Sequence, residues 1–187
     1  TRPEVDAARV FVLGHSLGGY LAPRIGRRDP KLAGVIIMAG NTRPLEELIV
    51  EQTAYISSLQ KNPAAQKQID EIQQTAEQIR NVKAGDTIMG VSAAYWLDLK
   101  GYRPAEEARN LTMPLLVLQG GRDYQVTMAD FAGWKRALEG KATLKSYPAL
   151  NHLFVEGEGK SRPDEYGKPA HVSELLIDDV AKWIAAH

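Results

Sequence analysis

Cysteine, an excess of charge of either sign and long hydrophobic runs are all missing from this 187-residue sequence. Without cysteine there is no disulfide framework and no thiolate metal site or nucleophile, and every redox compartment remains compatible. The 23 Lys and Arg residues balance the 23 Asp and Glu residues, so the charge favours neither nucleic acid nor an anionic membrane as partner. The longest apolar runs, such as Val35–Ala39 and Leu115–Leu118, fall far short of the roughly 18 residues of a membrane-spanning helix.

The composition is that of an ordinary globular domain. Hydrophobic residues make up 44% and charged residues 25% of the chain, which is typical of one domain that buries roughly 70% of its unfolded surface. The chain begins with Thr1 and reaches the apolar segment Val10–Leu13 almost at once. A processed precursor, a proteolysed chain and an internal starting point would all begin in this way. Localisation is therefore open, with a cytoplasmic and a secreted protein both compatible.

Apolar runs and amphipathic stretches alternate along the chain. The first run, Arg9–Leu13, ends at Gly14 and is followed by a helix candidate at Leu17–Arg28. The other expected elements are strands at Leu32–Ala39, Pro114–Gln119 and Ala142–Tyr147, helices at Ala129–Leu138 and Val172–Ala186, and a loop at Gly157–Pro169. We therefore predict an α/β fold with about four mainly parallel strands and flanking helices.

A helical insertion interrupts this alternation. From Pro44 to Tyr102 the composition shifts toward Gln, Glu, Lys and Ala, and apolar residues recur at helical spacing between Ile69 and Val82. The opposite side of that helix carries charges of both signs, which favours a helix folded on its own domain over a partner-binding or membrane-surface helix. The predicted boundaries are 1–43 for the first strands and helix, 44–110 for the insertion and 111–187 for the C-terminal part of the core.

The segment Gly14–Gly19 contains the pattern G-x-S-x-G between a predicted strand and a predicted helix. In this context the pattern is typical of a nucleophile elbow, a strained turn that exposes the serine hydroxyl, here that of Ser16. Glycines at positions 14 and 18 are expected to remove collisions where strand and helix cross. The amide of Leu17, at the start of the helix, is placed to stabilise an oxyanion. A phosphate-binding turn is disfavoured because the Walker-type Lys-Ser/Thr is missing.

A serine nucleophile needs a base and a carboxylate that orients the base. Asp123 follows the predicted strand at Pro114–Gln119, and His152 follows the one at Ala142–Tyr147. The C-terminal ends of parallel strands carry the sites of open α/β sheets. We therefore predict a catalytic triad of Ser16, Asp123 and His152 in the chain order of α/β-hydrolases.

At three places the sequence resembles the α/β-hydrolase superfamily, and in particular bacterial serine esterases related to dienelactone hydrolases and acyl-thioesterases. These places are Gly14–Gly19, Gly120–Val126 and Asn151–Phe154. The resemblance implies that Ser16 is the nucleophile, His152 the general base and acid, and Asp123 the residue that fixes the imidazole tautomer. It also implies that the insertion is a cap over the substrate pocket, lined by a segment that includes Tyr95 and Trp96.

The resemblance covers nearly the whole chain but only the C-terminal part of a complete hydrolase domain. In the family, four strands precede the nucleophile strand and supply the second oxyanion donor, and they are absent here. We therefore expect the Val10–Leu13 strand to be an edge that pairs with a missing N-terminal half or with a second copy of the chain. For the same reason the activity is expected of the complete protein, whereas that of this chain alone stays open.

Several other polar residues compete for roles in the site. His15 is expected to be a packing residue beside the nucleophile, and Asp130, the alternative acid, is expected on a solvated helix face. Arg122 and Tyr124 flank Asp123 and receive no role. His171 and His187 are expected to be exposed or terminal. No His, Asp and Glu cluster has metal spacing, so we expect no metal and no cofactor.

Together these features favour a serine hydrolase that cleaves a small carboxylic ester through an acyl-enzyme intermediate. A thioesterase or a serine peptidase would use the same triad, which does not encode the leaving group. A hydrolase-like scaffold that binds a ligand without turnover is the alternative from another class. The acyl and alcohol parts of the substrate cannot be predicted from the sequence, because the pocket depends on how the insertion folds.

Overall fold

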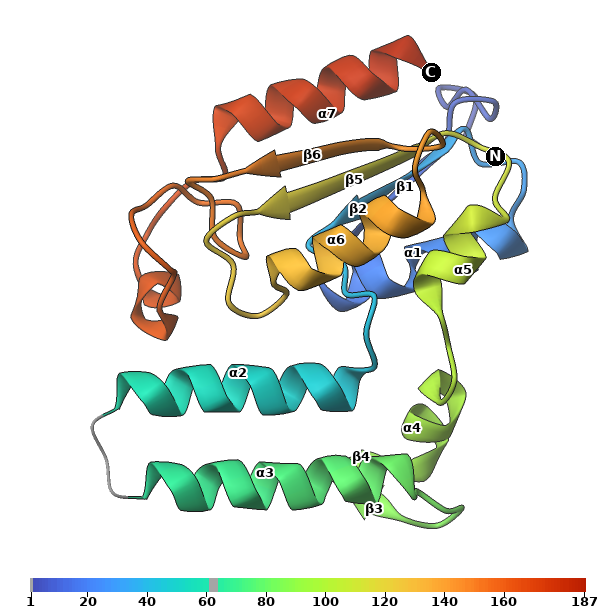
Figure 1. Ribbon diagram of the computed structural model, residues 1–187. Helices are drawn as coiled ribbons and strands as arrows, with labels where there is room; N and C mark the ends of the chain where they lie inside the picture. Colours follow the sequence, from blue (N-terminus) through green and yellow to red (C-terminus); the bar gives the residue numbers. More distant parts are fainter. Residues whose placement is uncertain (1, 61–63) are drawn as a thin grey trace. The chain divides into compact units, whose positions relative to one another are not determined.

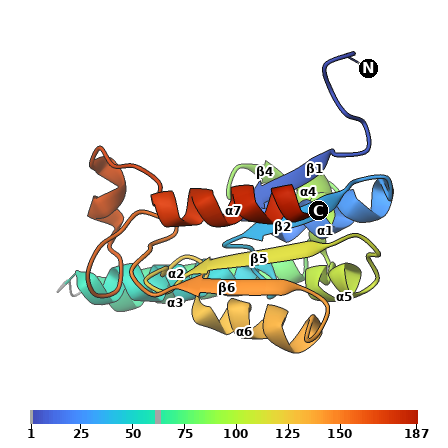
Figure 2. The ribbon, with the colours of Figure 1, turned by 90° about the horizontal axis from the view of Figure 1, so that it is seen from above.

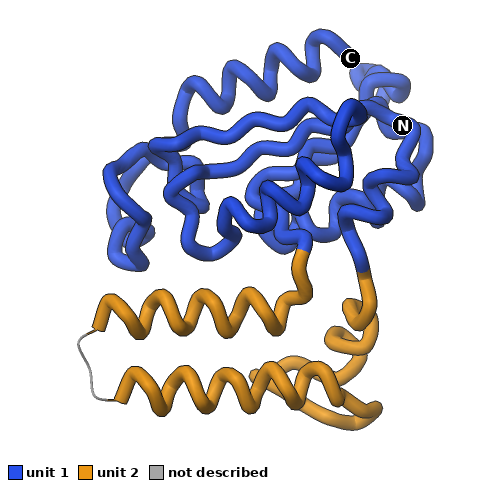
Figure 3. Tube along the Cα trace, in the orientation of Figure 1, with its two compact units in different colours: residues 1–42, 103–187 blue, residues 43–102 orange. Residues whose placement is uncertain are grey.

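The computed structural model describes residues 2–60 and 64–187. The chain forms two compact units, one of residues 1–42 and 103–187 and the other of residues 43–102 (Figure 3). Each unit has its own elements and its own packed side chains. The assignment of residues 44–110 as a cap stays a prediction.

The first unit is built on a parallel four-stranded sheet. Its strands are β1 (Phe11–His15), β2 (Gly34–Met38), β5 (Leu115–Gly120) and β6 (Thr143–Tyr147). They lie in the order β1-β2-β5-β6, and every neighbouring pair is parallel. All residues of β2 and β5 are buried, as expected of the central strands of a covered parallel sheet. The predicted α/β class and its parallel strands are confirmed.

Helices cover both faces of this sheet, with α7 (Glu174–Ala186) on one face and α1 (Leu17–Arg28), α5 (Pro104–Arg109) and α6 (Met128–Ala137) on the other (Figures 1 and 2). Alternation along the strands supplies both cores, because successive side chains point to opposite faces. Val35 and Ile37 pack in the cluster that includes Trp134 of α6. Ile36 packs in the other cluster, with Trp183 of α7.

The strand β1 forms one edge of the sheet. It pairs with β2 from Phe11↔Gly34 to His15↔Met38, and within the described residues no other strand pairs with it. Leu13 on this edge strand is 50% exposed. The expected loop at Gly157–Pro169 contains a short 3₁₀ helix, η1 (Pro163–Gly167).

The second unit contains the helices α2 (Leu45–Leu59), α3 (Ala65–Arg80) and α4 (Ala93–Leu99). It also contains a hairpin of two short antiparallel strands, β3 (Thr87–Ile88) and β4 (Val91–Ser92), which the sequence analysis did not predict. Met89 and Gly90 form its two-residue turn, both with positive φ, as hairpin turns of this length require. Strands of two residues are too short to show alternation, so no pattern indicated them.

No helix in the described parts of the chain has the length and apolarity needed to cross a membrane.

Candidate active site

The motif serine lies in the turn between β1 and α1. Ser16 has φ 56° and ψ −119°, a backbone conformation that residues other than glycine rarely adopt. The Ser16 amide donates to the Met38 carbonyl at 2.9 Å, and the Ser16 carbonyl accepts from the Tyr20 amide at 2.9 Å. The sheet and the helix thus hold this conformation from both sides. Leu17 is the first residue of α1, where backbone amides have no partner within the helix.

The glycines of the motif show where strand and helix approach each other. A Cβ atom on Gly14 would lie 2.1 Å from the Gly18 carbonyl oxygen, so this position requires glycine. The expectation for Gly18 is wrong, because a Cβ atom there would have no atom of another described element within 4 Å. The second close approach is at Gly19, whose Cβ would lie 3.0 Å from Gly40 Cα and from the Met38 carbonyl oxygen.

The structure brings the predicted acid and the predicted base together. Nδ1 of His152 lies 2.7 Å from Oδ2 of Asp123, and the two residues are only 4% and 3% exposed. Asp123 follows β5 and His152 follows β6, whose C-terminal ends are adjacent in the parallel sheet. Because a carboxylate only accepts, Nδ1 must carry the proton. Nε2 of a neutral His152 is then a free base.

Three further donors hold the carboxylate of Asp123. Oδ1 accepts the backbone amides of Gln125 at 2.7 Å and Val126 at 3.1 Å. Oδ2 also accepts Nε2 of Gln119 at 3.2 Å. Gln119, which is buried near the end of β5, was not among the residues predicted for the site. A polar residue inside an otherwise apolar buried strand is the signal that would have identified it.

His15 contacts the loop that follows β6 and carries His152, residues 148–156, which we call the histidine loop. Its Nε2 lies 2.8 Å from the main-chain oxygen of His152, so this nitrogen is the donor, and the two imidazole rings lie 4.7 Å apart. Burial is the main cause that lowers the pKa of His15, and electrostatic repulsion from His152 lowers it further. The hydrogen bond to the His152 carbonyl and the attraction of Asp123 partly oppose this lowering. Within residues 2–60 and 64–187, the Ser16 hydroxyl forms no hydrogen bond with His152. The contact to His152 is instead made by His15, the residue before Ser16 in the chain.

The competing acid, Asp130, is not where the sequence analysis expected it. It is 0% exposed rather than on a solvated face of α6. Its Oδ1 accepts the backbone amide of Thr42 at 2.8 Å and the Thr42 hydroxyl at 3.2 Å. Hydrogen bonds to a neighbouring loop allow this carboxylate to be buried. Asp130 thus contacts Thr42, whereas the residue in contact with His152 is Asp123.

Tyr95 and Trp96 lie together in α4 of the second unit. Trp96 belongs to that unit's apolar cluster, and its indole nitrogen donates to the Ile88 carbonyl at 3.3 Å. Tyr95 packs edge-on against Trp96 with ring centroids 5.1 Å apart, and burial raises its pKa. A role of these two side chains in a substrate pocket stays a prediction.

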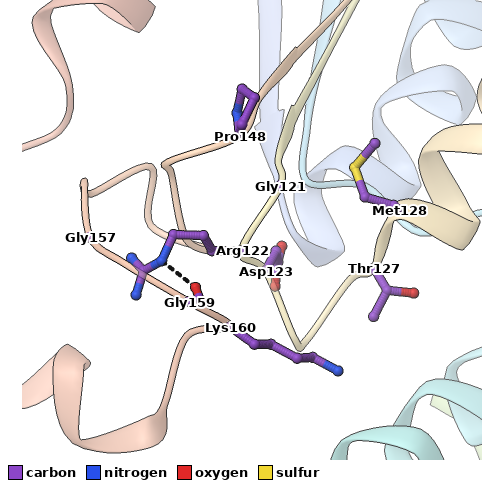
Figure 4. Close-up of a pocket in the computed structure, with 9 residues that line it drawn as sticks. All are labelled: Gly121, Arg122, Asp123, Thr127, Met128, Pro148, Gly157, Gly159 and Lys160. Atoms are coloured by element: carbon purple, nitrogen blue, oxygen red, sulfur yellow. Dashed lines mark hydrogen bonds between the residues drawn. The ribbon is translucent and has the colours of Figure 1, made fainter.

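A cavity of about 470 Å³ lies beside the loop between β5 and α6 that carries Asp123, residues 121–127, which we call the acid loop (Figure 4). It is lined by residues of the acid loop, by the start of α6 and by the segment after the histidine loop, among them Arg122, Asp123, Thr127, Met128, Gly157 and Lys160. A second cavity of about 340 Å³ is lined by His15, Met38 and apolar residues of the histidine loop and the segment before α7. In the described part of the chain, no three His, Asp or Glu side chains are grouped as metal ligands.

The parallel sheet, the strained serine turn and the acid and histidine loops define an α/β-hydrolase core, present here in part. A family model described as "Hydrolase_4: Serine aminopeptidase, S33" matches residues 1–160, so the chain belongs to this family. The chain is 40% identical over 183 residues to esterase EstD of Thermotoga maritima, covering 96% of this chain and 43% of that protein. It is 27% identical over 193 residues to a monoacylglycerol lipase of Mycolicibacterium smegmatis, covering 95% of this chain and 62% of that protein.

Among solved structures, acetyl xylan esterase 1 of a Thermoanaerobacterium species has a TM-score of 0.55 at 17% identity, covering 98% of this chain and 47% of that one. This likeness confirms the fold. The present chain spans about half the length of the curated relatives that it matches.

Proposed function

We propose that the protein to which this chain belongs is a serine hydrolase that cleaves carboxylic esters. The observation that carries the proposal is the buried Asp123–His152 hydrogen bond of 2.7 Å, in the same sheet that presents Ser16 in a strained turn. The identity to an esterase and a lipase supports the ester as substrate. A small-molecule ester is therefore the expected substrate.

In the proposed mechanism the Ser16 oxygen attacks the ester carbonyl carbon, and the serine proton passes to Nε2 of His152. The tetrahedral intermediate then collapses, the C–O bond of the alcohol breaks, and His152 gives its proton to the departing alkoxide. His152 then deprotonates a water molecule, whose oxygen attacks the acyl carbon. The second tetrahedral intermediate collapses, the bond from the acyl carbon to the Ser16 oxygen breaks, and His152 returns the proton to Ser16 as the carboxylic acid leaves. Asp123 stabilises the imidazolium through Nδ1, and the Leu17 amide donates one hydrogen bond to the oxyanion.

The absence of a Ser16–His152 hydrogen bond is compatible with this mechanism, because catalytic hydrogen bonds are often long without substrate and tighten in the complex.

The second oxyanion donor would come from strands beyond the unpaired edge of β1. We infer that this edge pairs with strands outside the 187 residues, since the chain covers only 43% of the esterase EstD. Those strands would carry the second donor, which is worth about 3–4 kcal/mol.

The family description names a serine aminopeptidase, so a peptide substrate is the second candidate. Peptide and ester hydrolysis share the acyl-enzyme and differ in the leaving group, an amine or an alcohol. Matched p-nitrophenyl esters, thioesters and aminoacyl anilides, assayed on the full-length natural protein, separate the candidates. We expect turnover to be fastest with the esters.

Ser16→Ala in the full-length natural protein tests the serine mechanism. We expect ester turnover to be lost while the melting temperature changes little, because the hydroxyl buries almost no apolar area. Retention of wild-type turnover by a folded Ser16→Ala protein would overturn the proposal.

A further inference from the structure

The acid loop is anchored to the segment that follows the histidine loop. Arg122, which directly precedes Asp123, is 5% exposed. Its Nε donates to the Gly159 carbonyl at 2.6 Å and its Nη2 to the Glu158 carbonyl at 2.9 Å; Figure 4 shows the guanidinium between the acid loop and this segment. Arg122 thus holds the segment with charged hydrogen bonds.

The backbone of the segment is fitted to this arginine. A Cβ atom on Gly157 would lie 2.1 Å from Arg122 Nη1, so only glycine allows the guanidinium to lie there. The main chain of Arg122 also contacts this segment. Its carbonyl accepts the Ser161 amide at 3.0 Å and the Ser161 hydroxyl at 2.8 Å. Both ends of Arg122 are therefore fixed.

Glu165, in η1, joins this anchor to the histidine loop. Its Oε1 accepts Nη2 of Arg122 at 2.8 Å, and its Oε2 accepts Nδ2 of Asn151 at 3.3 Å. Arg122 immediately precedes Asp123, and Asn151 immediately precedes His152. One carboxylate thus binds the two residues next to the proposed acid and base.

Asn151 in turn shapes the loop that carries His152. Its Oδ1 accepts the backbone amides of Leu153 at 2.9 Å and Val155 at 3.1 Å, and the residue is almost completely buried. These bonds fix the backbone on the C-terminal side of His152, and Nδ2 fixes Asn151 to Glu165. The position of the imidazole therefore depends on where Glu165 holds Asn151.

The hydrogen bonds that Glu165 accepts favour its charged form. Burial alone would raise the pKa of Glu165, but the Arg162 amide, Arg122 and Asn151 all donate to the carboxylate and together lower that pKa. Replacing the carboxylate by an amide leaves one acceptor oxygen for donors on both sides, so an amide can serve only one of the two loops.

We propose that Glu165 is a positioning residue. Through Arg122 and Asn151 it keeps Nδ1 of His152 within hydrogen-bond distance of the Asp123 carboxylate. The inference rests on the proposed function for its catalytic consequence, but the geometry it concerns is measurable without turnover. Neither Arg122 nor Glu165 touches substrate in this account. Both act through the relative position of the two loops.

The test compares Glu165→Gln with Asp164→Asn in the full-length natural protein. Asp164 is the adjacent carboxylate. Its side chain is 63% exposed and forms ion pairs with the side chains of Arg162 and Lys168, which are also on the surface. Two-bond ¹H–¹⁵N NMR spectra distinguish the Nδ1–H from the Nε2–H tautomer of each histidine, and His152→Gln assigns the signal. We expect the Nδ1–H tautomer of His152 in the wild type and in Asp164→Asn, and a mixture of tautomers in Glu165→Gln.

Kinetics on the full-length natural protein give the second readout. Glu165→Gln should lower kcat about tenfold, because a displaced base loses catalytic alignment, with KM within about twofold and with Asp164→Asn unchanged. A folded Glu165→Gln chain with a wild-type His152 tautomer and wild-type kcat would overturn the inference. If the proposed function is wrong, the Ser16→Ala protein will retain its ester turnover. That result does not affect the tautomer measurement, which needs no turnover.

Glu165→Asp covers the case in which Glu165→Gln does not fold. The shorter side chain keeps the charge but cannot reach both Arg122 and Asn151, so the mixed His152 tautomer is again expected. Unfolding of both variants at 25 °C would also contradict the inference, because Glu165 would then be a requirement of the fold rather than of the Asp123–His152 pair.

Discussion

Oδ2 of Asp123 lies 2.7 Å from Nδ1 of His152, and both side chains are buried against the C-terminal ends of β5 and β6. The same carboxylate accepts two backbone amides and the Gln119 side chain. Four donors on one carboxylate fix both its orientation and the tautomer of the histidine. In the proposed mechanism this arrangement prepares Nε2 of His152 to take a proton from Ser16.

Asp123→Asn should therefore lower ester turnover far more than it lowers stability. The amide has a single acceptor oxygen, so its NH₂ group faces either His152 or the backbone amides, and the Nδ1–H tautomer is no longer favoured. The expected loss in kcat is on the order of 10⁴-fold, as for the equivalent change in another triad enzyme. Steady-state kinetics of the full-length natural protein measure it, and a loss of less than about tenfold would contradict the assigned role.

Glycines 14 and 18 of the motif should respond in opposite ways to alanine. The new Cβ at Gly14 would lie 2.1 Å from a carbonyl oxygen, whereas the Cβ at Gly18 would have no atom of another described element within 4 Å. We expect Gly14→Ala to lower the free energy of unfolding by about 3 kcal/mol or more, and Gly18→Ala to change it by about 1 kcal/mol at most. Urea denaturation measures both. Equal effects of the two changes would contradict the described crossing of β1 and α1.

The buried His15 should make stability depend on pH. Its pKa in the folded protein is lowered from about 6.5, first by burial, so the unfolded chain takes up a proton at higher pH than the folded chain. The free energy of unfolding should then fall as the pH drops below about 6.5 toward the lower folded value. Above that pH this contribution is constant.

His15→Gln removes this titration and keeps a donor for the His152 carbonyl. Urea denaturation at about pH 7.5 and about pH 5 should therefore show a smaller loss of stability in His15→Gln than in the wild type. The exposed His171 provides the control, since His171→Gln should lose as much stability as the wild type. An undiminished loss in His15→Gln would show that other groups cause the pH dependence.

The free edge of β1 should make the 187-residue chain associate. Leu13 on this strand is 50% exposed, and Val10, which directly precedes the strand, is 40% exposed. Unpaired strand edges are templates for pairing. Light scattering should detect dimers or larger species, and Leu13→Lys should shift the population toward monomers. A wild-type chain that stays monomeric at every concentration would contradict the prediction, and full esterase activity of that monomer would remove the need for further strands.

The α/β class was predictable because β2 and β5 are continuous apolar runs between turn residues, a pattern that local sequence carries. The contact between Asp123 and His152 was predictable because the C-terminal ends of neighbouring parallel strands lie at the same edge of the sheet. The burial of Asp130 was not, since it depends on Thr42, which lies far away in the chain. The two contacts of Glu165 were not predictable for the same reason: its partners come from separate loops, and no local pattern indicates such contacts.

Covalent labelling of Ser16 tests the central claim most directly. A fluorophosphonate probe reacts with an activated serine, and peptide mass spectrometry of the labelled full-length natural protein locates the adduct. We expect the label on Ser16, no label in Ser16→Ala, and much slower labelling in His152→Gln, with a known serine esterase as positive control. An unmodified Ser16, or equal labelling rates of the wild type and His152→Gln, would contradict the serine hydrolase account.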